Sequence, residues 1–454
     1  MATLRITEKC CVPRKPSLLQ AASLVAGCLL CVNAGLADDW PQWLGPNRDS
    51  VWRENGIVKK FPDQGLPIRW RTEVRDGYSG PAVADGRVFV LDYVHTTGKA
   101  SDSPIVRSEL EGTERVLCLN AEDGSLLWKH EYECPYRIAY PGGPRATPTV
   151  DGKRVYTLGA EGDLLCFHVA DGKVIWSKQL RKEYQTKSPL WGFCGHPLVD
   201  GRKLICLVGG VGSVVVAFDK TSGKELWRSL SAEDPGYCPP TLITVEGRRQ
   251  LVIWHPEAIN GLDPETGALY WSVPLKPDYG MSITAPRQYG SFLFASGHVT
   301  VGALLKLAPE PAAEIVWRGT GNTAVYCCNS VPYIEDGIIY GVCATGGQLR
   351  AVELTTGDRL WETFAPTTGR RRTSHATAFL VKHKDRCFLF NEQGDLILAR
   401  LSREGYEEIS RFHVLEPTST SGGRNVVWSH PAFANQCVYA RNDNELVCVS
   451  LATD

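Results

Sequence analysis

The sequence predicts an all-β protein, an eight-bladed β-propeller with four antiparallel strands in each blade. Two observations support this prediction. A short motif returns eight times, and most copies combine a tight turn with a strand that carries a Trp or Phe. Successive copies lie 44 to 58 residues apart, and periods near this length with four strands per repeat are typical of propellers. The anchor residues of the copies are Trp70, Trp128, Trp176, Trp227, Trp271, Trp317, Trp361 and Phe412.

Each module contains signals for four short strands. The first strand ends in a tight turn, as in PTVDG at 148–152, and a β-branched and aromatic run such as RVYTLG at 154–159 follows it. A third strand alternates in polarity, as in LLCFHV at 164–169, and a DG or TG turn leads to the strand with the Trp. The alternation and the turn residues both indicate strands joined by hairpins.

The eighth module is divided between the two ends of the chain. Trp70, in GLPIRW, has only the second half of the motif, whereas the C-terminal LVCVSLATD has only the first half. We therefore expect the strand around Trp70 to complete the last blade, so that N- and C-terminal strands close the ring. Closure removes the exposed sheet edges of an open array.

The repeated tryptophans are predicted to be structural. A large ring at one fixed position in each blade can fill the wedge between neighbouring twisted sheets, with roughly 150–250 Å² buried per ring. This blade-docking role is assigned to Trp70, Trp128, Trp176, Trp227, Trp271, Trp317 and Trp361.

Three segments are expected along the chain. Residues 1–37 have the pattern of a signal peptide, with a basic start, an apolar run at 18–32 and a small-residue cleavage site at 35–37. An uncleaved membrane anchor and a lipoprotein signal ending at Cys28 are the alternatives. Residues 38–69 form an N-terminal lead-in segment, and residues 70–454 form a single propeller. We therefore expect an exported protein of the periplasm or cell envelope.

The net charge and the positions of the cysteines exclude some classes of function. The formal net charge of −1 leaves no basic footprint for nucleic acid. Cys118, Cys166 and Cys448 occupy the same strand position in different modules, which indicates buried small apolar side chains. After residue 37 the chain has no CxxC pair and no Cys/His spacing suited to zinc, so no metal site is expected.

The repeats resemble those of the PQQ-like (quinoprotein-type) β-propeller family, in which a turn of the form Asp-x-x-Thr-Gly-x-x-x-Trp docks one blade on the next. Asp263…Thr266-Gly267…Trp271 matches this motif closely, and Asp219…Gly223…Trp227 nearly so. The resemblance covers about residues 38–454 and implies the fold more than the function. It implies either a dehydrogenase that binds pyrroloquinoline quinone and calcium, or an exported protein without cofactor, similar to the outer-membrane assembly factor BamB.

The longest connections are expected on one face of the disk, because links between blades and second-to-third turns share that face. Binding residues usually lie on such loops. The links reach the central channel just before each first strand, and aromatic side chains there could stack on a sugar or flat ring while Arg could grip a carboxylate. The alternative is that these residues line a wet channel and bond to one another. The candidates are Tyr78, Arg145, Trp191, His196, Tyr237, Tyr326, Asn329, Arg371, His375, Arg424, Trp428 and His430.

Three histidines near one channel raise the question of a metal ion. His375 and His430 come from adjacent modules, but His196 belongs to the third module, so we expect it to lie far across the ring and the three not to ligate one ion. Cys327 and Cys328 are adjacent in the link before the sixth module, where we expect one thiol to face the channel and one to be packed. The alternative, implied by the resemblance to quinoprotein dehydrogenases, is a disulfide between these neighbouring cysteines next to a quinone.

The function predicted from these features is a non-catalytic scaffold that binds a protein, peptide or glycan through its loop-rich face, without cofactor. The alternative is a pyrroloquinoline quinone-dependent dehydrogenase, which needs carboxylate and Asn ligands for calcium and an Asp base. No GxSxG, HExxH or paired-carboxylate motif supports a hydrolase or lyase.

Overall fold

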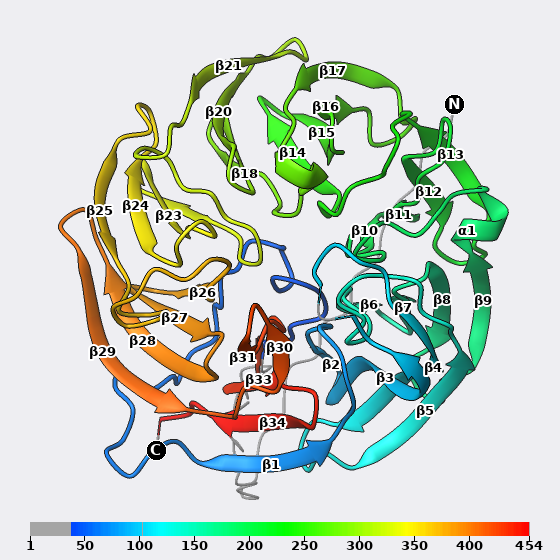
Figure 1. The fold of residues 1–454 in the computed structure, drawn as a ribbon, viewed down its shortest axis with the longest axis horizontal. Helices are drawn as coiled ribbons and strands as arrows, with labels where there is room; N and C mark the ends of the chain where they lie inside the picture. Colours follow the sequence, from blue (N-terminus) through cyan, green and yellow to red (C-terminus); the bar gives the residue numbers. More distant parts are fainter. Residues whose placement is uncertain (1–37, 102, 454) are drawn as a thin grey trace, which may run out of the picture. The chain divides into compact units, whose positions relative to one another are not determined.

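The ring of eight sheets predicted from the repeats is confirmed (Figure 1). The computed structural model describes residues 38–453 except residue 102. Each blade is a four-stranded antiparallel sheet, and in the first seven blades the strands follow one another in sequence order from the channel outward. The expected signal peptide at residues 1–37 lies outside the described residues.

The first four blades contain β2 to β17. The first comprises β2 (Ala82–Ala84), β3 (Arg87–Lys99), β4 (Glu109–Asn120) and β5 (Leu126–Glu133). The second comprises β6 (Thr149–Asp151), β7 (Arg154–Leu158), β8 (Asp163–His168) and β9 (Val174–Gln179), followed by the short helix α1 (Leu180–Glu183). The third comprises β10 (Leu198–Asp200), β11 (Lys203–Leu207), β12 (Val215–Asp219) and β13 (Glu225–Ser229). The fourth comprises β14 (Thr241–Val245), β15 (Arg248–Trp254), β16 (Ala258–Leu262) and β17 (Leu269–Pro274).

The remaining blades complete the circle. After the 3₁₀ turn η1 (Asp278–Gly280), the fifth blade comprises β18 (Arg287–Tyr289), β19 (Phe292–Gly297), β20 (Val301–Leu307) and β21 (Ala313–Arg318). The sixth comprises β22 (Tyr333–Glu335), β23 (Ile338–Val342), β24 (Leu349–Glu353) and β25 (Arg359–Thr363). The seventh comprises β26 (Ala378–His383), β27 (Arg386–Asn391), β28 (Asp395–Leu401) and β29 (Tyr406–His413). A hairpin of β30 (Ser419–Ser421) and β31 (Arg424–Val426) precedes the eighth blade, which contains β32 (Ala432–Ala434), β33 (Cys437–Arg441) and β34 (Glu445–Ser450).

The expected closure of the ring is also present. The N-terminal strand β1 (Ile68–Glu73) pairs antiparallel with β34, with Trp70 opposite Cys448, and so supplies the outer strand of the eighth blade. In Figure 1, β1 and β34 lie side by side although they belong to opposite ends of the sequence. The two halves of the motif therefore form one blade.

Burial explains the two strand patterns in each module. Central strands such as β11 and β27 are buried throughout, because neighbouring blades cover both faces of each sheet. The outer strand β21 alternates between half-buried and exposed residues, because its outward side faces solvent. A run of apolar residues followed by an alternating strand is therefore what a blade inside a ring requires.

The repeated tryptophans lie between blades. The rings of Trp70, Trp128 and Trp176 face the turn glycines of the following blade, Gly124, Gly172 and Gly223. The indole N–H of Trp128 donates to the Val169 carbonyl across this boundary at 2.8 Å. Trp271 differs, because the next turn (residues 308–313) contains no Gly; its ring lies over Gly261 of its own blade instead.

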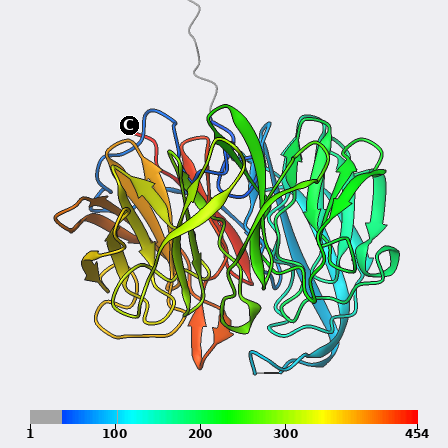
Figure 2. The ribbon, with the colours of Figure 1, turned by 90° about the horizontal axis from the view of Figure 1, so that it is seen from above.

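The two faces of the ring are unlike each other (Figure 2). The long hairpin β3–β4 and the hairpin β30–β31 extend from one face, which we call the loop-rich face, while the N-terminal segment that precedes β1 lies on the opposite face. Within the described residues, no helix has the length and apolar character needed to cross a membrane.

Candidate functional site

A central cavity of about 780 Å³ lies where the inter-blade links converge on the loop-rich face. Its walls are mostly aromatic and apolar. Seven aromatic side chains other than histidine line it: Trp43, Tyr78, Tyr140, Trp191, Tyr237, Tyr279 and Trp428. Cavities of this volume with apolar walls are typical of sites that enclose a small molecule or a side chain of a partner.

Most of the residues selected from the sequence meet in this cavity. Ten of the twelve candidates line it: Tyr78, Arg145, Trp191, His196, Tyr237, Asn329, His375, Arg424, Trp428 and His430. They converge because each lies in the link that leads to the innermost strand of its blade, and the innermost strands surround the channel.

Tyr326 and Arg371 do not line the cavity. Tyr326 is buried among apolar residues of the fifth and sixth blades, and its hydroxyl donates to the Thr320 carbonyl at 2.5 Å. Arg371 is exposed, and its own carbonyl accepts a hydrogen bond from the Thr368 hydroxyl. Both residues lie earlier in their links than the turn that reaches the channel. Position within the link therefore determines whether a residue lines the cavity.

The floor of the cavity comes from the N-terminal segment. Trp43 is 4 % exposed and packs with Leu44 against Ala285 and Val331 of the fifth and sixth blades. Arg48 donates to the Pro197 carbonyl at 2.9 Å. The segment thus closes the channel at the face opposite the loops. The sequence analysis missed this floor; the pair Trp40 and Trp43, which stands outside the repeat, is a signal that could have pointed to it.

His196 and His430 lie close together, which corrects the expected separation. Trp43 stacks on the His196 ring with centroids 4.5 Å apart and meets the His430 ring edge-on at 5.8 Å. The two imidazoles are themselves 6.5 Å apart. The N-terminal segment fills the middle of the channel, so side chains from distant blades meet through it.

Both cavity-lining arginines are occupied by protein groups. Arg145 donates to the carbonyls of Ala139, Tyr140 and Gly143 and lies over the Tyr78 ring at 5.3 Å. Arg424 pairs with Glu392 at 2.9 Å. These guanidinium groups hold the links in place, so the expected grip on a carboxylate would have to displace existing bonds.

Several buried His, Tyr and Cys side chains of the cavity are uncharged near neutral pH. Burial lowers the pKa of His375 to about 4 and that of His430 to about 3, and raises the pKa of Tyr78 to about 12. Burial also raises the pKa of the Cys328 thiol to about 12. Among the described residues that line the cavity there is no carboxylate.

The adjacent cysteines have different environments. Cys328 lines the cavity, whereas Cys327 is packed against Gly341 and other core residues of the sixth blade. Both are free thiols. The cavity-facing thiol is therefore Cys328.

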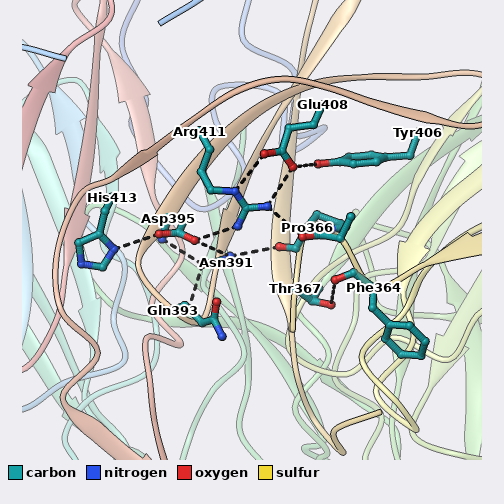
Figure 3. Close-up of polar contacts among 11 residues, drawn as sticks. Phe364, Pro366, Thr367, Asn391, Gln393, Asp395, Tyr406, Glu408, Arg411 and His413 are labelled. Carbon is teal, nitrogen blue, oxygen red and sulfur yellow. Dashed lines mark hydrogen bonds and ion pairs between the residues drawn. The ribbon is translucent and has the colours of Figure 1, made fainter. Parts of the chain in front are cut away.

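A second polar cluster lies in the seventh blade, but its groups bond to one another (Figure 3). Arg411 donates to Asp395 at 2.9 Å and to both oxygens of Glu408, and His413 contacts the other oxygen of Asp395 at 3.0 Å. The Asn391 side chain donates to the Pro366 carbonyl at 3.2 Å. This network fixes the second-to-third turn of the blade against its outer strand and the preceding link, and we assign it a structural role.

One protein family and two characterised relatives are similar in sequence to this chain. The profile of the family described as "Outer membrane protein assembly factor BamB" matches residues 112–304 and 257–454. The BamB protein of Shewanella oneidensis is 23 % identical over 266 residues, which is 56 % of this chain and 65 % of that protein. The quinohemoprotein alcohol dehydrogenase ADH-IIG of Pseudomonas putida is 26 % identical over 221 residues, 45 % of this chain but 27 % of the enzyme. The chain thus spans less than two thirds of the length of either relative.

Solved structures show the same fold. BamB from Moraxella catarrhalis superposes with a TM-score of 0.54 at 16 % identity, covering 84 % of this chain and 96 % of that one. The quinohemoprotein alcohol dehydrogenase from Comamonas testosteroni superposes with a TM-score of 0.57 at 12 % identity, covering 93 % and 82 %. At such identities the likeness establishes the propeller and leaves the chemistry to the residues of the cavity.

Proposed function

Because the chain belongs to the PQQ-like β-propeller family described by the outer membrane protein assembly factor BamB, we propose that it is an exported, non-catalytic scaffold that binds a protein segment through its loop-rich face. The observation that carries the proposal is the aromatic cavity at the centre of that face, whose described lining has no carboxylate and whose two arginines are bound by protein groups. An aromatic or aliphatic side chain of the partner would occupy it.

The rim of the cavity supports a protein partner. Ile105 is 61 % exposed and Tyr279 is 75 % exposed, and both border the opening. Val106, next to Ile105, is 50 % exposed. Exposed apolar side chains around an aromatic pocket are the arrangement that anchors a partner's buried side chains.

Hydrogen bonds hold the tip of the long hairpin β3–β4 at this rim. The carbonyl of Pro104, at its tip, accepts the indole N–H of Trp191 at 2.7 Å. Arg107 donates to the Ser188 carbonyl at 3.0 Å. These bonds tie the tip of the first blade's insertion to the link before the third blade, so Ile105 is held at the cavity opening.

The quinone-dependent alternative is supported by similarity to the dehydrogenase relatives, but the donor set does not fit the cofactor. Calcium prefers six to eight oxygen ligands, including carboxylates. The described lining residues offer the amide of Asn329 and no Asp or Glu, and Glu392 behind them is already paired with Arg424 and Trp428. The residues of this cavity therefore do not fit pyrroloquinoline quinone with calcium.

Site-specific photo-crosslinking in cells that express the full chain tests the proposal. A photoreactive residue at Ile105 or Tyr279 should crosslink to a polypeptide, whereas one at Arg248, which begins β15 beside the β14–β15 turn on the opposite face, should not. Trp428→Ala should weaken crosslinking at Ile105 by tenfold or more, because a buried aromatic contact contributes about 2 kcal/mol. Val316→Ala, on an exposed outer strand, is the matched control.

Two outcomes would contradict the proposal. One is equal crosslinking from Arg248 and from the rim, or crosslinking only to glycans. The other is reduction of an artificial dye by the purified protein when pyrroloquinoline quinone, calcium and an alcohol are added, which would favour the dehydrogenase.

A further inference from the structure

Two histidines and one cysteine from consecutive blades meet on one wall of the cavity. His298 lies in the turn between β19 and β20 of the fifth blade, Cys328 precedes β22 of the sixth, and His375 precedes β26 of the seventh. One nitrogen or sulfur atom from each residue lies within 4.8 Å of the other two. Their separations in sequence, 30 and 47 residues, give no local metal-binding motif.

Two of the three side chains in this cluster are buried, and the third, His375, is half-buried. His298 is 6 % exposed and Cys328 is 2 % exposed. The Nδ1 atom of His298 is enclosed yet has no hydrogen-bond partner among the described residues. Leaving a buried polar atom unpaired is costly, so native structures usually give such an atom a partner.

We propose that His298, Cys328 and His375 form a binding site for a thiophilic transition-metal ion of the zinc class, with the remaining coordination position open to the cavity. This site goes beyond the binding function proposed above and does not depend on it. It differs from a calcium site because its donors are nitrogen and sulfur.

The donor set selects the kind of ion. Zn²⁺ takes imidazole nitrogen at about 2.0 Å and thiolate sulfur at about 2.3 Å in tetrahedral geometry, which places neighbouring ligand atoms about 3.4–3.7 Å apart. The His298 and His375 rings stack nearly parallel with centroids 4.7 Å apart, so one imidazole has to turn out of this stack for the three atoms, which lie within 4.8 Å of one another, to take that spacing. Ca²⁺ and Mg²⁺ require oxygen ligands, so they do not suit this cluster.

The protonation states are compatible with binding. Burial lowers the pKa of both His298 and His375, so both imidazoles are neutral near pH 7 and each has a free lone pair. The Cys328 thiol is protonated in the absence of metal, because burial raises its pKa to about 12. Formation of the metal–sulfur bond releases that proton to solvent, with no change in oxidation state.

Three protein ligands leave one tetrahedral position. All three side chains line the cavity, so a water molecule or a donor atom of a bound molecule would fill the fourth position. Zinc sites with three protein ligands and an open position are the kind that bind exchangeable ligands, whereas closed structural sites have four protein ligands.

Cobalt spectroscopy tests the site directly. The full-length, reduced protein is treated with a chelator, dialysed and titrated with Co²⁺. We expect one equivalent to bind, with the ultraviolet charge-transfer band of a cobalt–thiolate bond and the intense visible bands of tetrahedral Co²⁺, both removed by Zn²⁺.

Variants assign the ligands. Cys328→Ser should remove the charge-transfer band, and His298→Ala or His375→Ala should weaken Co²⁺ binding by at least about tenfold, since even changes outside the ligand shell have effects of that size. Cys194→Ser is the matched control, because Cys194 lines the same cavity but its thiol donates to the carbonyls of Trp191 and Gly192. Circular dichroism checks that each variant is folded.

The results that would overturn the proposal are specific. They are the absence of a thiolate band in the wild-type protein, a band that survives in Cys328→Ser, or a band lost in Cys194→Ser. Rim crosslinking would be unaffected by any of these results, so failure of the metal site and failure of the scaffold function can be told apart.

Discussion

Glu114 shows how a single buried residue connects two blades. Its carboxyl group is fully buried and accepts hydrogen bonds from the Tyr136 hydroxyl at 2.5 Å, from the Tyr132 hydroxyl, and from the Ala160 backbone N–H at 2.9 Å. Ala160 belongs to the second blade, so these bonds join it to the first. Burial raises the pKa of Glu114 to about 7, and the hydrogen bonds oppose this only in part.

This pKa predicts a pH-dependent stability. Between about pH 4.5 and 7 the folded protein keeps the Glu114 proton that the unfolded chain releases. The stabilising contribution of the protonated Glu114 to folding is therefore fully present below pH 4.5 and is lost as pH rises towards 7. Across this window the free energy of unfolding of the wild type should fall, relative to Glu114→Gln, by up to about 3 kcal/mol. Urea denaturation at a series of pH values measures the difference. Glu122→Gln, an exposed control, should follow the wild type; parallel curves for Glu114→Gln would contradict the prediction.

At the scale of the element, the contact between a Trp and the next blade's turn is the repeated unit of assembly. Gly172 has a φ of +69° and faces Trp128, so an added Cβ would come within 2.5 Å of the indole. Gly152 has a similar φ of +55°, but an added Cβ there would meet nothing within 4 Å. Substitutions at the two glycines therefore distinguish the cost of backbone strain, which both share, from the cost of steric contact with Trp128, which only Gly172 has.

We expect Gly172→Ala to destabilise the protein more than Gly152→Ala. Both substitutions place Ala at positive φ, which costs about 1–2 kcal/mol. Only Gly172→Ala also forces the Trp128 ring to move, which adds about 1–3 kcal/mol. Chemical denaturation gives both values, and equal losses in the two variants would show that blade docking does not depend on this contact.

The elements could be predicted from the sequence more fully than the site could. Strands and turns follow from local alternation and from residues such as Gly172, so all eight blades were predictable. The cavity was predicted in part, because link residues such as Trp428 precede each inner strand. His298 was missed because it lies in a second-to-third turn rather than in a link, and Trp43 because its contacts are with blades more than 150 residues away.

For the whole molecule, the decisive feature is closure of the ring. Arg441 of β33 is 0 % exposed and donates to the Leu91 carbonyl of β3 at 2.7 Å and to the Arg75 carbonyl. It joins the eighth blade to the first by bonds that supplement the β1–β34 pairing. A buried cation with several backbone acceptors is a strong link, because its removal leaves those carbonyls unpaired.

Arg441→Met should therefore lower the free energy of unfolding by about 3 kcal/mol, and hydrogen exchange should rise mainly in β1, β2 and β34, where the ring would open. Arg350→Met is the control, since Arg350 is 3 % exposed and donates within the sixth blade region to Ala324 and Glu362. Exchange in that variant should rise around β24 and β25 instead. A uniform rise in both variants would contradict a special role for Arg441 in closure.

By itself, the sequence determined the all-β class, the eight blades and the shared eighth blade, because strand alternation, turn residues and the Trp motif are local and recur in every module. Only the tertiary structure decided which residues face one another in the channel. Residues 38–50 close its floor, Arg145 and Arg424 are bound by protein groups, and His298, Cys328 and His375 come together from three blades. These contacts depend on how the ring closes and how each link bends, and no spacing along the chain encodes either.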